Sequence, residues 1–157
     1  MTKVIFLHHS TGEAIWKGKT SKYVYRLTGK GDVFKYISNY NRKYKTNYEI
    51  EARYFPKSTP YGWNNYPYDY YNIWVKNAGA DPYMEEPTLE MLTSEFDVII
   101  FKHCFPVSRI VPDTGMPDLN SEIKSLENYK LQYDALKKKM HEFPSRKFIT
   151  WTPAANT

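Results

Sequence analysis

Side chains that can act as nucleophiles, bases or metal ligands follow two short apolar runs of the sequence. Residues 4–7 lead into His8-His9-Ser10-Thr11-Gly12, and residues 97–101 lead into Lys102-His103-Cys104. Short apolar runs with polar ends are typical of strands buried in a parallel sheet. The carboxyl ends of parallel strands share one edge, where open α/β sheets bind their ligands. We therefore expect the two groups of side chains to meet at one site.

Ser10 is the candidate nucleophile. A hydroxyl just after a strand, followed by a small residue and Gly12, can stand exposed above a turn, with neighbouring backbone N–H groups free to hold an oxyanion. His9 is adjacent in the chain, but neighbouring side chains rarely point the same way, so His103 is the better local base. These histidines could instead be structural, with ring nitrogens that tie loops to backbone carbonyls.

A metal or a cofactor is not expected. The ligand types of zinc and iron are present in His8, His9, His103 and Cys104, but no His-x-x-x-His or Cys-x-x-Cys pair occurs. The glycine motifs of nucleotide-binding loops are also missing. Cys104 is the single cysteine, so the chain holds no internal disulfide, and its thiol is best interpreted as buried.

A segment rich in aromatic residues follows the first third of the chain. Its rings are interleaved with Asn and Asp, a combination that suits the stacking and hydrogen bonding of sugar rings or nucleobases. The same rings could instead pack the segment onto the rest of the protein. The aromatic residues are Tyr61, Trp63, Tyr66, Tyr68, Tyr70, Tyr71 and Trp74.

Composition excludes several classes of protein. The chain has 157 residues, 41% of them hydrophobic, so it is neither disordered nor fibrous. No apolar run approaches the roughly 20 residues that span a bilayer. A signal peptide is also missing, which predicts a cytoplasmic location. The net charge is +5, and the basic residues concentrate in residues 1–57, most simply as a solvated face. Nucleic acid is therefore not the expected partner, and any binding through that region would be steeply salt-dependent.

The remaining pattern alternates strands and helices. Strands are expected at 4–7, 48–55, 97–101 and 147–151, and helices from Asp32 to Tyr44, from Thr88 to Glu95 and from Asn120 or Ser121 to about Glu142. Residues 56–83 are rich in Pro, Gly and Asn, which predicts a long loop or insertion with at most one short helix near 70–76.

This order predicts an α/β fold with a mostly parallel sheet and right-handed crossovers. Residues 1–157 then form a single domain with the aromatic segment as an insertion. The last expected strand ends six residues before the terminus. A doubly wound domain normally continues with a helix, so we expect the domain to be truncated at its C-terminal side.

The first apolar run and its polar end resemble the SGNH (GDSL-like) hydrolase superfamily, whose first block is an apolar strand followed by Gly-Asp-Ser. Here His8-His9 replace Gly-Asp, and Ser10 matches the nucleophile. The chain is closer still to an uncharacterised branch of that superfamily, on the His-His-Ser-Thr-Gly block and on residues 65–75, 97–106 and 127–133. The resemblance implies a three-layer, flavodoxin-like fold and acyl-ester hydrolysis.

Three features depart from the superfamily pattern. The Asn of the third block is replaced by Lys102-x-Cys104, and Gly62 is only a weak match for the glycine of the second block. The final Asp-x-x-His block, which supplies the catalytic base, does not occur in these residues. We therefore expect the 157-residue chain to show background hydrolase activity, with the complete dyad or triad in a longer protein.

The resulting hypothesis is a serine esterase-like hydrolase that acts on a small-molecule or glycan ester. Ser10 is the nucleophile, and its backbone N–H helps to hold the oxyanion. The pocket residues are Gly12, Gly62, Lys102, His103 and Cys104, and the substrate-binding residues are His9, Trp63, Asn65, Tyr66 and Tyr68. The alternative is a non-catalytic carbohydrate-binding module that uses the aromatic segment.

Overall fold

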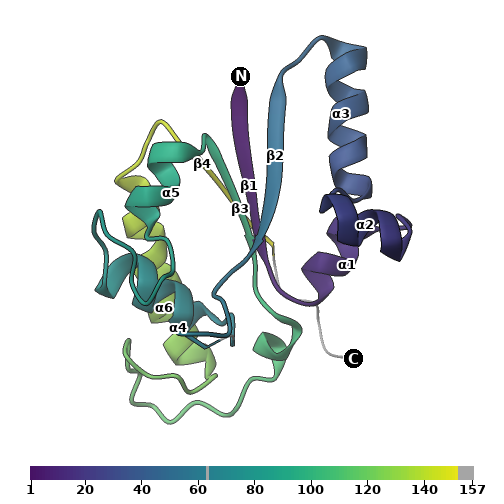
Figure 1. The fold of residues 1–157 in the computed structure, drawn as a ribbon. Helices are drawn as coiled ribbons and strands as arrows, with labels where there is room; N and C mark the ends of the chain where they lie inside the picture. The colour runs from purple at the N-terminus through teal and green to yellow at the C-terminus, as the bar shows by residue number, and fades with distance from the viewer. Residues whose placement is uncertain (63, 152–157) are drawn as a thin grey trace.

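The computed structural model describes residues 1–62 and 64–151. Four parallel strands form one sheet in the order β2-β1-β3-β4 (Figure 1). Their bounds are Thr2–His8 for β1, Tyr48–Tyr54 for β2, Val98–Lys102 for β3 and Lys147–Trp151 for β4. All four carboxyl ends therefore lie at the same edge, which confirms the α/β class and the parallel sheet that the sequence predicted.

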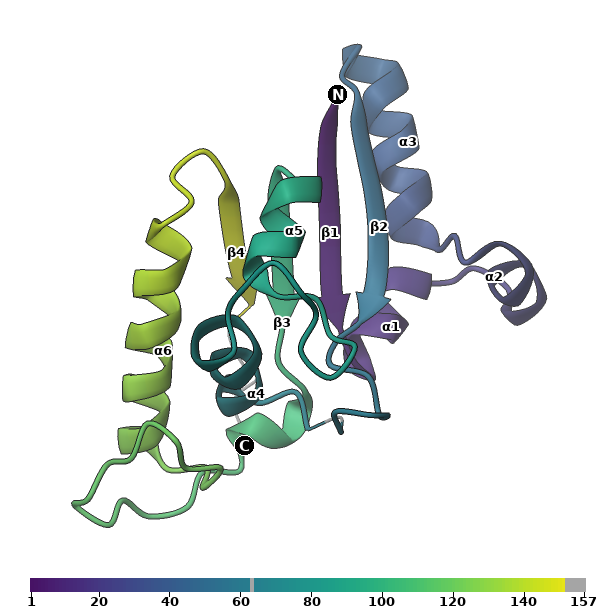
Figure 2. The same ribbon diagram turned by 60° about the vertical axis from the view of Figure 1, so that its left-hand side comes forward.

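Helices cover both faces of this sheet. The chain moves across the sheet in one direction from β1 to β2, and in the other from β2 to β3 and β4, so right-handed crossovers place the two groups of helices on opposite faces. Figures 1 and 2 show this three-layer arrangement. One layer holds α1 (Thr11–Lys17), α2 (Lys22–Thr28) and α3 (Asp32–Tyr44), and the other holds α4 (Pro67–Tyr71), α5 (Leu89–Glu95) and α6 (Leu126–His141).

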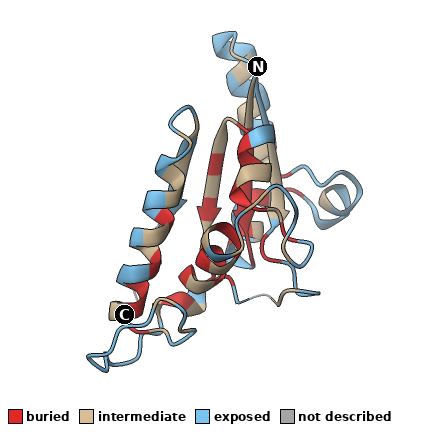
Figure 3. Ribbon diagram, turned by 90° about the vertical axis from the view of Figure 1, so that its left-hand side faces the viewer, coloured by how far each residue is buried: buried red, intermediate tan, exposed pale blue. Residues whose placement is uncertain are grey.

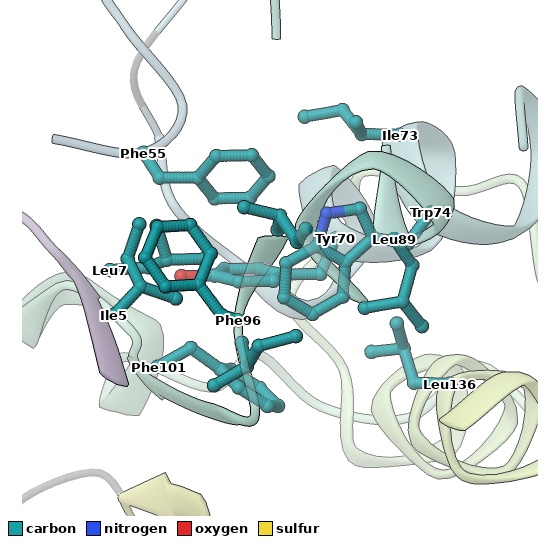
Figure 4. Packing of buried hydrophobic residues seen from close by; sticks show 12 residues of the cluster. Ile5, Leu7, Phe55, Tyr70, Ile73, Trp74, Leu89, Phe96, Phe101 and Leu136 are labelled. Carbon is teal, nitrogen blue, oxygen red and sulfur yellow. The ribbon is translucent and has the colours of Figure 1, made fainter. Parts of the chain in front are cut away.

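The hydrophobic core lies between the sheet and the helices α4, α5 and α6. Because side chains alternate along a strand, Ile5 and Leu7 of β1 and Ile99 and Phe101 of β3 point into this layer, and all four are fully buried. Figure 3 shows the buried residues concentrated there, and Figure 4 shows their packing. The other members of the cluster are Phe55, Tyr70, Ile73, Trp74, Leu89, Leu92, Phe96 and Leu136.

The opposite face of the sheet is only partly covered. Val98 and Ile100 of β3 are half-buried, and Ile149 and Trp151 of β4 are exposed. The sequence predicted burial of β3 on both faces, and this is correct only for the face that meets α4–α6. The reason is that α1 packs beside β1 and α3 packs beside β2, so neither covers β3 or β4 (Figure 2).

The aromatic segment forms part of the core. After a loop, it folds into α4 and a following π-helical turn, Asn72–Lys76, close to the short helix expected near 70–76. Tyr70 and Trp74 are fully buried, and their rings meet edge to face at 4.8 Å. These rings therefore pack the insertion onto the sheet, as the second interpretation of the segment proposed.

Helix α6 begins later than the sequence predicted. Asn120 and Ser121 are in the preceding loop, and the buried Ser125 caps the helix, its hydroxyl accepting from the Asn128 N–H at 3.3 Å. The loop is held instead by polar side chains, because Gln132 Nε2 donates to the Ser121 carbonyl at 2.8 Å. Ile123 fits the apolar spacing but is 55% exposed.

Within residues 1–62 and 64–151, none of the helices is long and apolar enough to cross a membrane.

Candidate functional site

The ends of β1 and β3 are joined by one side chain. Lys102, the last residue of β3, extends its ammonium group to Thr11, and Nζ lies 2.7 Å from Thr11 Oγ1. The same nitrogen lies 2.9 Å from the carbonyl oxygen of His103. The two polar groups that follow the strands are therefore adjacent at the carboxyl edge of the sheet, because β1 and β3 are direct neighbours.

Ser10 is exposed at this edge and has a strained backbone. It lies between β1 and α1, with φ 35° and ψ −98°, a conformation that residues with a side chain rarely adopt. Its carbonyl accepts from the Ala14 N–H at 3.2 Å, while its hydroxyl does not cap the helix. Strain of this kind is concentrated at functional sites, because the surrounding structure must enforce it.

Gly12 has a packing role. It is buried against His8, and a Cβ at this position would lie 2.3 Å from the Cβ of His8. Its N–H donates to the His9 carbonyl at 2.7 Å, so this group is already used within the turn. Gly62 is half-buried with φ 103°, a left-handed conformation that suits glycine, and it has open space around its Cα.

Burial favours the neutral forms of His8 and His9. Desolvation lowers the pKa of His8 to about 4, with a smaller contribution from neighbouring His9. The pKa of His9 is also lowered by burial, although its hydrogen bond from Nε2 to the Pro56 carbonyl acts in the opposite direction. That bond ties the end of β1 to the loop after β2. His9 therefore has the structural role considered for these histidines, in which a ring nitrogen ties a loop to a backbone carbonyl.

His103 lies inside the protein rather than at its surface. The residue is 1% exposed, and rings of Tyr70, Phe101 and Tyr133 surround it with centroid distances of 4.8, 5.9 and 5.6 Å. Neither ring nitrogen has a hydrogen-bond partner among the described residues, although the Asn65 backbone lies near enough to favour the charged form slightly. Desolvation dominates and lowers the pKa of His103 to about 3.

Asn65 connects the loop after β2 to the end of β3. Its side-chain amide donates to the Phe55 carbonyl and to the Tyr70 hydroxyl, the latter at 3.0 Å. Its backbone carbonyl accepts from the N–H of the buried Cys104 at 3.2 Å. Asn65 and Cys104 are therefore parts of the scaffold.

The aromatic substrate-binding candidates are partly accessible. Tyr66 and Tyr68 are half-buried, and Lys124 Nζ lies 5.0 Å from the centre of the Tyr66 ring. Trp63 lies outside the described residues.

A groove adjoins the site on the side of β2. It has a volume of about 480 Å³ and is lined by His9, Tyr54, Lys57, Ser58 and Thr59. A second groove of about 690 Å³ shares Tyr54 and Lys57 with it and continues toward α5. The Tyr54 hydroxyl donates to the Glu13 carboxylate. Burial and, to a smaller extent, this hydrogen bond raise the pKa of Tyr54.

Sequence reasoning missed Thr11, Tyr54 and Lys57 as site residues. Tyr54 and Lys57 could have been found from the rule already applied to β1 and β3, because they stand at the carboxyl end of β2. The contact between Thr11 and Lys102 had no sequence signal, since it depends on the register of β1 against β3.

No group of three His, Cys, Asp or Glu side chains converges to hold a metal ion within the part of the chain that the structure describes. A search of protein-family models, curated proteins and solved structures finds no match to this chain.

Proposed function

We propose that this protein is an ester hydrolase whose site is the carboxyl edge of β1 and β3, with Ser10 as the acyl acceptor. One observation carries the proposal: an exposed hydroxyl sits on a strained residue at the strand end, directly before a Thr–Lys contact between two neighbouring strands. Hydroxyl nucleophiles held in this way are typical of acyl-transfer sites.

The strand order supports the finer fold assignment. The order β2-β1-β3-β4 corresponds to the first four strands of the flavodoxin-like order 2-1-3-4-5, in which ligands bind where the chain reverses direction, between β1 and β3. Ser10, Thr11 and Lys102 lie at that point. We therefore propose a flavodoxin-like, SGNH-type arrangement, in agreement with the motif resemblance.

Each side chain near Ser10 has a distinct proposed role. We assign the oxyanion to the backbone N–H of Ser10 and an N–H of Lys102, whereas the Gly12 N–H is already bonded to the His9 carbonyl. The groove beside His9, Tyr54 and Lys57 would hold the rest of the substrate. His103 is too deeply buried to reach an ester, so the base that completes the Ser10 reaction is not His103.

The carbohydrate-binding alternative has less support. It depends on aromatic rings that face outward, and three of them, Tyr70, Tyr71 and Trp74, are buried. Of the proposed substrate-binding rings, Tyr66 and Tyr68 remain half-buried and available in part. This pattern favours a packing role for most of the segment.

The test is the transfer of an acyl group from p-nitrophenyl acetate. Trypsin releases residues 4–17 as one peptide, because Lys3 and Lys17 flank it, and fragmentation of that peptide locates the acetyl group. We expect an acetyl adduct on Ser10 that forms slowly, because the Asp-x-x-His block does not occur in these residues, and Ser10→Ala should lower the rate of its formation by about 10²-fold or more. Ser21→Ala is the matched control, since Ser21 caps a helix away from the site. An unchanged rate in Ser10→Ala would remove Ser10 from the mechanism.

A further inference from the structure

Thr11 contacts a candidate base, whereas Ser10 has no such contact with the residues that the structure describes. The distance of 2.7 Å between Thr11 Oγ1 and Lys102 Nζ lies within the range expected for a nucleophile and its base. Thr11 is exposed and precedes the buried Gly12, so its hydroxyl is open to a ligand. The pair therefore has both the geometry and the access that an acyl acceptor needs.

The surroundings of Lys102 make it easier for its ammonium group to lose a proton. Burial lowers the pKa of Lys102, against a weaker opposing effect from Cys104. None of the ion pairs between described residues includes Lys102, so no carboxylate holds its proton. The other titratable groups nearby are His8 of β1, His103 after β3 and, farther away on α1, Glu13 beside His8 and Tyr54.

The hydrogen bonds of Lys102 also fit an amine that accepts a proton. One N–H can remain on the His103 carbonyl at 2.9 Å. The free electron pair then faces the Thr11 hydroxyl, which becomes the donor across the 2.7 Å contact. The carbonyl thus fixes the direction of the electron pair.

We propose that Thr11 and Lys102 form a nucleophile–base pair, and that Thr11 is a second acyl acceptor at this edge, independent of any histidine. The inference shares the reaction class of the proposed function, acyl transfer from an ester, but does not depend on Ser10. Its substrate class is an activated ester small enough to enter beside α1.

The step balances without another reactant. The O–H bond of Thr11 breaks and its proton moves to Lys102 Nζ, while Oγ1 bonds to the carbonyl carbon of the ester. The tetrahedral intermediate then expels the alcohol, which takes the proton from Nζ and leaves an acyl ester on Thr11. In the second half Lys102 takes a proton from water, and the resulting hydroxide attacks the acyl carbonyl carbon. The proton on Nζ then passes to Thr11 Oγ1 as the acid leaves, which restores the Thr11 hydroxyl.

The protein contains a similar pair that serves as an internal control. Lys35 Nζ lies 2.9 Å from Thr20 Oγ1, but Thr20 is buried and donates its own proton to Asp32 at 2.7 Å. Lys35 is also ion-paired with Asp32 at 3.4 Å. The proposal therefore predicts that Thr20 takes no acyl group, because its hydroxyl is buried and its proton is held by Asp32.

The experiment maps acetylation by p-nitrophenyl acetate on the 157-residue chain. We expect an acetyl group on Thr11 in the wild type and in Ser10→Ala, and no acetyl group on Thr20. Lys102→Arg keeps a donor for Thr11 and His103 but cannot lose its proton, so the rate of Thr11 acetylation should fall by about 10²-fold. Thr11→Val should lose the adduct, Thr11→Ser should keep it, and Lys35→Met should behave as the wild type.

Lys102→Met provides a second test if the arginine variant folds poorly, with circular dichroism as the check on folding. In the wild type the rate of Thr11 acetylation should rise with pH until Lys102 is neutral. An adduct on Ser10 alone would overturn this inference and leave the proposed function standing. An adduct on Lys102 itself, or Thr11 acetylation that Lys102→Arg does not change, would also overturn it. An adduct on neither hydroxyl would overturn both proposals.

Discussion

Burial determines the charge of the histidines beside the site. His8, His9 and His103 are all buried, and desolvation lowers the pKa of each. A neutral imidazole in the fold and a protonated one in the unfolded chain make stability depend on pH. Asp69 acts in the opposite direction, because burial raises its pKa to about 6. Single replacements are therefore needed to separate these contributions.

His103→Phe should remove part of the acid sensitivity of the fold. Below its unfolded pKa the unfolded state binds a proton that buried His103 cannot accept, so the wild type loses stability as the pH falls. This should cost about 2–3 kcal/mol between about pH 7 and pH 4.5. Phenylalanine suits the pocket of Tyr70, Phe101 and Tyr133 and leaves no ring nitrogen unpaired.

Urea unfolding at the two pH values measures this difference. The wild type should lose more stability on acidification than His103→Phe, whereas His141→Phe, at the exposed end of α6, should follow the wild type. Equal losses in the wild type and in His103→Phe would mean that the His103 imidazole reaches solvent or a partner.

The start of α6 depends on its capping residue. Ser125 is fully buried, and its hydroxyl satisfies the Asn128 N–H, so Ser125→Ala leaves a buried donor without its partner. We expect a loss of about 1 kcal/mol in the free energy of unfolding. Ser21→Ala removes the equivalent cap of α2, where Ser21 accepts from Val24, but α2 has no buried residue among its seven.

For Ser21→Ala we expect local fraying of α2, with little change in the free energy of unfolding of the whole protein. Thermal melting compares the two variants directly. Equal losses would imply that α2 contributes to the cooperative unit, and no loss in Ser125→Ala would imply that the loop before α6 recruits another cap.

Sequence reasoning succeeded where local chemistry and burial agree. Thr88 was predicted to cap a helix and does so, accepting from the Met91 N–H at 3.4 Å. It did not predict α1, and it failed for α2 because α2 has no apolar face toward the core, with Leu27 88% exposed. Sequence reasoning placed the start of α6 too early, because Ile123 matches the apolar spacing of the helix but lies in the loop before it. The strand ends of the site were predictable, but the Thr11–Lys102 contact was not.

At the scale of the whole molecule, the two faces of the sheet differ in cover. The face toward α4–α6 is closed by the core cluster, whereas the face beside α3 retains an apolar groove of about 370 Å³. The groove runs between α3 and residues of all four strands. It is lined by Val4, Tyr36, Ile37, Tyr40, Tyr48, Ile50, Val98, Ile100, Lys147 and Ile149.

This groove should bind an apolar dye such as anilinonaphthalene sulfonate in the native state, because contiguous apolar surface rather than scattered residues attracts such ligands. Ile149 is 45% exposed within the groove, so Ile149→Lys should lower dye fluorescence several-fold at little cost to stability. Leu27 is 88% exposed but lies away from the groove, and Leu27→Lys should leave the signal unchanged. Equal effects of the two substitutions would show that the dye reports general exposure, and the asymmetry of the sheet would then have no consequence for binding.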